Sequence, residues 1–126
     1  MLSITLRLST CVGLAAAVAA CGSSTAPSST PVGGTTITIT SAGASPKNLL
    51  VSPGTQVSFV NNDTQPHTMN SDPHPEHGDC PTVNNVGFLA PGQSKQTGNL
   101  NVARTCGYHD HELFADTSLQ GRITIQ

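Results

Sequence analysis

Short runs of alternating apolar and polar residues follow one another along most of the chain. Residues 35–40, TTITIT, alternate threonine with isoleucine, and this pattern predicts a half-buried strand. The next run of this kind is split by Pro53-Gly54, a pair that favours a turn. The pattern therefore predicts several short strands joined by tight turns. The further strand-forming segments are residues 48–63, 85–100, 101–109 and 119–126.

Successive side chains of these segments point to opposite faces of an extended chain. Val57, Phe59 and Asn61 share a face, and the residues between them point the other way. No segment repeats apolar residues at helical period over several turns. We therefore expect an all-β fold, a Greek-key β-sandwich. Residues 67–85 form one long irregular stretch, and a loop of this length in a small domain is usually functional or disordered.

The first residues differ in composition from the rest of the chain. One basic residue, Arg7, precedes the apolar run CVGLAAAVAA, which is too short to span a bilayer as a helix. The small residues before Cys21 resemble the lipobox of bacterial lipoproteins, and an ordinary secretory signal cut nearby is the alternative. We predict a signal peptide at residues 1–20, lipid on Cys21 and a flexible tether at residues 21–34. The domain at residues 35–126 would then be exported and lipid-anchored on a periplasmic or extracellular face of the bacterial cell envelope.

Charge and residue types restrict the class of function. Without Arg7 the chain carries four basic side chains against seven acidic ones, a formal charge of −3. The absence of a basic patch argues against a nucleic-acid partner. The domain is near the size at which a disulfide or a metal aids stability, and it contains all five histidines. We expect a monomer in which the histidines carry the chemistry.

Residues 105–111, TCGYHDH, place a cysteine three residues before one histidine and five before another. The segment CGYH resembles the Cys-x-x-His of the cupredoxins, the family of small blue-copper domains. Residues 45–69 resemble the amino-terminal half of that family, and LQGRITI resembles its closing strand. The resemblance implies a β-sandwich that binds copper and transfers electrons. It also implies a trigonal centre in which His67, Cys106 and His109 supply two imidazoles and a thiolate.

The resemblance is incomplete at the axial ligand. The family usually places a methionine shortly after the second histidine, whereas this chain has Leu119 two residues before Gly121. Met69 would share a strand face with His67, so it is a candidate substitute, although packing in the core is the more ordinary role for it. A centre without an axial ligand would be three-coordinate and more oxidising.

Cys106 has two competing uses. Cys11 is lost with the signal peptide and Cys21 is lipidated, so Cys80 and Cys106 are the two thiols that remain in an oxidising compartment, where thiols usually pair. Plant cupredoxins resemble this chain in having a disulfide cysteine soon after the first histidine. Their partner cysteine lies beyond the copper cysteine, where this chain has His111. A Cys80–Cys106 bridge would add about 3 kcal/mol of stability and abolish a blue centre. The sequence leaves both uses open.

The histidines allow a second kind of centre. His111 follows His109 at a spacing of two, so both imidazoles face one side of an extended segment and either can be the second ligand. With the cysteines bridged, His67, His109 and His111 are candidate ligands of an all-imidazole site, which suits Cu(II) and also zinc. His74 and His77 lie in the acidic, proline-rich stretch SDPHPEHGD, whose carboxylates can orient imidazoles, and they are candidates for capping the site. This interpretation predicts copper binding, storage or delivery.

A redox enzyme is the third possibility. Copper-zinc superoxide dismutase is also a β-sandwich with a disulfide and several histidines. This domain is short for that family and lacks its glycine-rich strand pattern, and neither a HExxH motif nor a Gly-x-Ser-x-Gly elbow is present. An enzyme is therefore the least favoured interpretation. The sequence predicts a lipid-anchored copper protein that works with a redox or copper-transfer partner.

Overall fold

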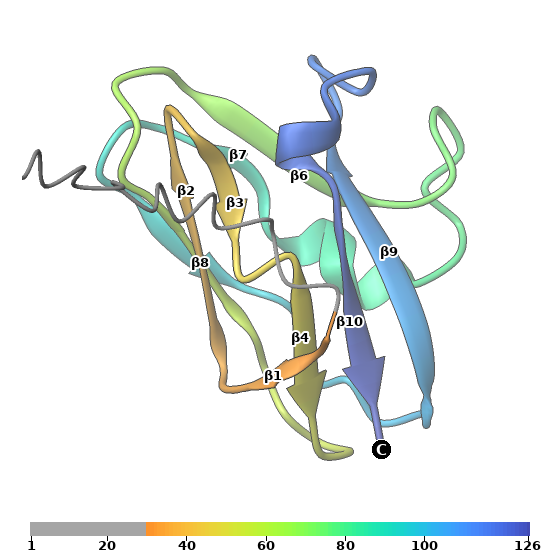
Figure 1. Cartoon of the computed structure of the whole chain (residues 1–126). Helices are drawn as coiled ribbons and strands as arrows, with labels where there is room; N and C mark the ends of the chain where they lie inside the picture. Colours follow the sequence, from red (N-terminus) through yellow and green to blue (C-terminus); the bar gives the residue numbers. More distant parts are fainter. Residues whose placement is uncertain (1–29) are drawn as a thin grey trace, which may run out of the picture.

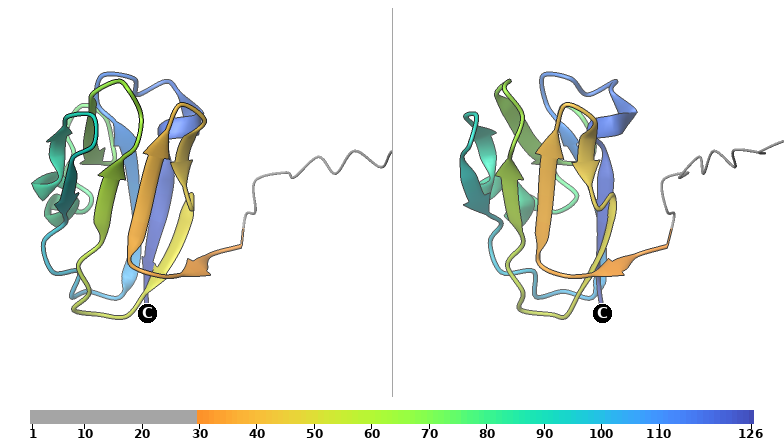
Figure 2. Two further views of the ribbon diagram at one scale, coloured as in Figure 1. Left: turned by 90° about the vertical axis from the view of Figure 1, so that its left-hand side faces the viewer. Right: turned by 60° about the vertical axis from the view of Figure 1, so that its left-hand side comes forward.

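The computed structural model describes residues 30–126, and the predicted signal peptide, Cys21 and most of the predicted tether lie outside these residues. Two β-sheets pack face to face, as Figure 1 and Figure 2 show. One sheet has the strand order β1-β4-β10-β9-β6-β7, and the other has the order β3-β2-β5-β8. The predicted all-β sandwich is confirmed.

Most strands lie where the apolar and polar pattern places them. Within the described residues, no helix is both long and apolar enough to cross a membrane. The strands are β1 (Val32–Gly33), β2 (Thr36–Thr40), β3 (Gly43–Ser45), β4 (Asn48–Val51), β5 (Ser58–Asn61), β6 (His67–Ser71), β7 (Gly87–Leu89), β8 (Ser94–Gln96), β9 (Arg104–Asp110) and β10 (Gly121–Ile125), and the short 3-10 helices are η1 (Pro81–Asn85) and η2 (Thr117–Leu119).

The core lies between the two sheets and consists of their inward-facing side chains. Val57, Phe59 and Asn61 are all buried, as their shared face predicts, and the isoleucines of β10 are buried in the same way. Phe59 of one sheet meets Tyr108 of the other edge to face, with ring centroids 5.2 Å apart. Burial raises the pKa of the Tyr108 phenol.

Two segments differ from the sequence-based expectation. The stretch 67–85 was expected to be one irregular loop, but His67–Ser71 forms β6, which pairs with β7 and β9, and Pro81–Asn85 forms η1. The alternating buried positions of β6 are occupied by a histidine, a methionine and a serine, so apolar periodicity did not reveal the strand. β1 lies within the stretch expected to be tether and pairs in parallel with β4.

Gly121 provides a test of the packing between β9 and β10. A Cβ at this position would lie 2.3 Å from the Tyr108 hydroxyl and equally close to the Lys47 carbonyl oxygen. We expect Gly121→Ala to lower the free energy of unfolding by about 1–3 kcal/mol, because a close-packed interior does not accept an added methyl group. Gly33→Ala is the matched control, since a Cβ there meets nothing within 4 Å. Equal urea midpoints for the two variants would contradict this expectation.

Candidate metal centre

Strand β9 divides its side chains between the two faces of its sheet. Because successive side chains of a strand point to opposite faces, Cys106 and Asp110 face the core and His109 faces outward. His111 continues the pairing with β6, since its N–H donates to the Thr68 carbonyl at 2.7 Å. The rings of His109 and His111 therefore lie on the same outer side, as their spacing predicts.

Four imidazoles gather on this outer side. His109 and His111 come from β9 and its extension, and His74 and His77 come from the loop of residues 72–80. One ligand nitrogen of each ring lies within 4.8 Å of the others. Four nitrogens bound to one ion at about 2 Å are separated by about 3–4 Å, so a small closure brings these rings to bonding distance.

Hydrogen bonds to oxygen determine the tautomers of His109 and His77. His109 donates from Nδ1 to the Asp72 carboxylate at 2.7 Å, which leaves its Nε2 for the cluster. His77 donates from Nδ1 to the Ser71 carbonyl at 2.9 Å, and its Nε2 lies 2.8 Å from Nδ1 of His111. Carboxylate and carbonyl oxygens can only accept, so these tautomers follow from the partners. Such supporting bonds orient metal-binding histidines in proteins.

Gly107 allows the Asp72 carboxylate to reach His109. A Cβ at position 107 would lie only 1.9 Å from Oδ2 of Asp72, so any larger residue would displace the carboxylate. The backbone N–H of Asp72 also donates to the Gly107 carbonyl at 3.1 Å. The loop is therefore attached to β9 directly beside the ligand that it orients.

Two buried nitrogens of the cluster have no hydrogen-bond partner in the described part of the chain. They are Nδ1 of His74 and Nε2 of His109. Buried polar atoms without partners are rare in folded proteins, and each one calls for an explanation. A metal ion between the rings would satisfy both. The residues present therefore fit an all-imidazole metal centre.

The surroundings of His74 favour the form of the ring that binds metal. Loss of hydration, with smaller contributions from His111, His109 and His77, holds the pKa of His74 below its usual value. The neutral imidazole is the ligand, so a lowered pKa leaves this ring available in weakly acidic solution. The ring of His74 stacks on the ring of Phe114, with centroids 4.1 Å apart and an angle of 7° between the planes.

His67 lies outside the cluster, on the other side of the sheet. It faces the core from β6, with Nδ1 2.7 Å from the Asp110 carboxylate and Nε2 3.3 Å from the Asp63 carboxylate. Asp110 stands between His109 and His111 in the sequence, so the pleat of β9 turns it inward toward His67. His67 therefore binds two carboxylates in place of joining the other imidazoles.

Cys106 forms a disulfide with Cys80, with Cα atoms 5.7 Å apart. The expected thiolate ligand is therefore corrected to a disulfide sulfur, the alternative that the sequence left open. The strand register separates this cysteine from His67 as well. β6 ends at Ser71, which pairs with Tyr108, so Cys106 lies beyond the end of β6, whereas His67 lies at its start. The expected set of His67, Cys106 and His109 is not brought together.

The two candidate axial residues also lie away from the four imidazoles. Met69 is fully buried in the core. Leu119 is buried at η2 and lines a hollow of about 120 Å³ together with His67. His74 and His77, which the sequence indicated as cap or support, instead stand among the potential ligands. Asp72 takes the orienting role that the acidic composition of their loop suggested.

The structure resembles solved cupredoxins. A purple cupredoxin from Nitrosopumilus maritimus superposes with a TM-score of 0.57 at 21% identity, over 74% of this chain and 100% of that one. A mutant amicyanin in the reduced state gives 0.59 at 15% identity over 72% and 80% of the two chains, and the oxidised plastocyanin of Dryopteris crassirhizoma gives 0.55 at 15% over 72% and 99%. No family model and no curated protein sequence matches this chain. The protein has the cupredoxin fold.

Asp72 provides a test of how the ligands are oriented. We expect Asp72→Asn to weaken metal binding about tenfold, because an amide accepts the His109 proton less strongly than a carboxylate does. Competition against a chromophoric chelator would measure the change. Glu76→Gln is the matched control, since it removes the same charge from the same loop. Equal losses in the two variants would assign the effect to charge and not to orientation.

The lowered pKa of His74 predicts how the metal-free protein responds to acid. The unfolded chain binds the proton more strongly than the folded chain, so the stability that the neutral ring contributes is present above pH 6.5 and lost as the pH falls through the folded-state pKa. We expect the free energy of unfolding to decrease as the pH falls below 6.5, and to decrease less in His74→Asn. Parallel pH dependences in the two proteins would contradict this.

Proposed function

We propose that this protein is an exported copper-binding protein of the bacterial cell envelope, held at the membrane by lipid on Cys21. Its metal centre is the four-histidine cluster. The proposal rests mainly on two buried ring nitrogens without partners, one on His74 of the loop and one on His109 of β9. Imidazole donors without thiolate or thioether suit Cu(II), and the cupredoxin fold is consistent with copper.

Copper binding, storage or delivery fits this centre better than fast electron transfer. A blue centre depends on a thiolate, and both cysteines of the described domain are bridged. Two of the four rings lie on a loop, so the site can change shape between copper oxidation states. His74, His77 and His111 are also partly exposed, which lets the ligands of a partner protein approach the metal.

An electron carrier is the second candidate. The similarity of the fold to a purple cupredoxin, an amicyanin and a plastocyanin favours it. In that case the imidazole centre would itself cycle between the two copper oxidation states. The partner protein would then be a redox protein and not a copper acceptor.

A Cu(II) titration of the purified protein tests the proposal. We expect one Cu(II) per chain and a weakly coloured complex, because no thiolate is available to give intense charge transfer. His109→Ala should weaken binding by more than about 100-fold, since loss of a ligand exceeds the effect of a supporting residue. Visible spectra and chelator competition would measure both.

His67→Gln is the matched control, and it should leave copper binding unchanged because His67 lies across the sheet from the cluster. An intense blue complex that His67→Gln abolishes would overturn the proposal and establish a blue-copper carrier. Tight zinc binding without copper binding would support the four-histidine site but assign zinc to it in place of copper.

A further inference from the structure

The disulfide and the histidine cluster join the same two segments of the chain. The loop of residues 72–80 supplies two imidazoles and Cys80, and β9 with its extension supplies the other two imidazoles and Cys106. On each segment the cysteine stands three residues from a ring of the cluster, His77 on the loop and His109 on the strand. A metal ion in the cluster would therefore be a second cross-link beside the first.

Noncovalent contacts provide the rest of the attachment between the loop and β9, among them the hydrogen bond between the rings of His77 and His111. Asp72 binds Gly107 through the backbone and His109 through its carboxylate. Asp79 forms an ion pair with Arg104 at the far end of the loop, but both side chains are partly exposed, and such pairs contribute little. The Cys80–Cys106 bond is therefore the strongest link between the loop and β9. It lies at the carboxyl end of the loop, after His74 and His77.

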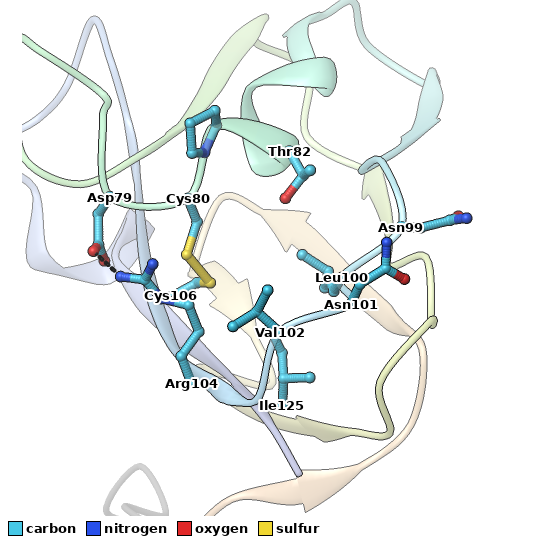
Figure 3. Close-up of a pocket in the computed structure, with 11 residues that line it drawn as sticks. Asp79, Cys80, Thr82, Asn99, Leu100, Asn101, Val102, Arg104, Cys106 and Ile125 are labelled. Carbon is cyan, nitrogen blue, oxygen red and sulfur yellow. Dashed lines mark hydrogen bonds and ion pairs between the residues drawn. A yellow bond between two sulfur atoms is a disulfide. The ribbon is translucent and has the colours of Figure 1, made fainter.

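The disulfide is placed where a small reductant can approach it. It borders a surface hollow of about 230 Å³, with Leu100, Val102 and Ile125 on the walls and the Asp79–Arg104 pair at the edge, as Figure 3 shows. The two cysteines are almost fully buried, at 4% and 1% exposure. The hollow is therefore the side from which a small thiol would approach the bridge.

We propose that the Cys80–Cys106 disulfide and the histidine cluster are energetically coupled, so that reduction of the disulfide weakens metal binding and bound metal opposes reduction. The inference rests on the proposed metal site. With the bridge intact the loop is already held against β9, and the metal does not have to order it. Because coupling between two sites is reciprocal, each event changes the other by the same factor.

The reduction itself is thiol–disulfide exchange with a dithiol. One thiolate of the reductant attacks a sulfur of the bridge, forms a mixed disulfide and releases the other cysteine as thiolate. The second thiol of the reductant then displaces the first cysteine, and the reductant leaves as a cyclic disulfide. Two electrons pass to the protein, which ends with two cysteine thiols and a loop held by noncovalent contacts alone, among them the hydrogen bonds of His77 to Ser71 and Asn84.

Zinc affinity is the first readout, because Zn(II) is redox-inert and suits imidazole ligands. We expect the double variant Cys80→Ser/Cys106→Ser to bind Zn(II) about tenfold more weakly than the bridged protein. Arg104→Gln is the matched control: it removes the neighbouring ion pair and leaves the bridge, and its affinity should stay within about twofold. Equal affinities of the double variant and the wild type would overturn the inference. Binding by neither protein would instead overturn the proposed metal site.

The reciprocal measurement uses the wild-type protein, so it tests the coupling even if the double variant does not fold. Thiols are counted after equilibration with mixtures of a dithiol and its cyclic disulfide, with and without enough Zn(II) to saturate the protein. We expect half reduction to need about a tenfold higher ratio of free dithiol to cyclic disulfide in the presence of zinc. A reduction curve that zinc does not shift, or shifts toward easier reduction, would refute the coupling.

Discussion

The alternation of side chains along β9 is the constraint on which the rest of the site depends. Within six residues this strand sends Cys106, Tyr108 and Asp110 into the sandwich and His109 and His111 out of it. The inner set forms the disulfide, an aromatic contact and the partner of His67. The outer set forms half of the imidazole cluster. A one-residue shift in the pairing of β9 would exchange these roles, so the register that buries the core also determines where a metal can bind.

The fold is that of the cupredoxins, but the histidine cluster lies outside the sandwich. Inside the sandwich, His67 is buried and bonded to Asp110 and Asp63, and this position offers no free thiolate. The outer centre depends on a loop that has to be held down. Gly107 admits Asp72 against the strand, and Cys80 anchors the end of the loop. A fold and a site can vary independently, because a site is built from side chains on a framework that tolerates their exchange.

Stability and metal binding draw on the same small set of residues. A domain of this size has a limited core, and its few aromatic side chains restrict that core further. The disulfide ties two segments that share few other strong contacts. Within residues 30–126 two buried nitrogens of the cluster have no hydrogen-bond partner, which is unfavourable, and under the proposed function an ion would satisfy them. Metal binding and folding of this loop are therefore expected to support each other.

The sequence by itself determined the strands and the local geometry of the ligand pairs. Alternation in TTITIT and around Phe59, together with the Pro-Gly turns, was sufficient for an all-β sandwich, since strand period and turn chemistry are local properties. The same period placed His109 and His111 on one side. The sequence could not show that β6 begins at His67, because two of its three buried positions are occupied by polar residues. Nor could it show that His74 and His77 meet His109 while His67 does not. These outcomes depend on the register between β6 and β9 and on the path of residues 72–80, and only long-range pairing in the folded chain decides both.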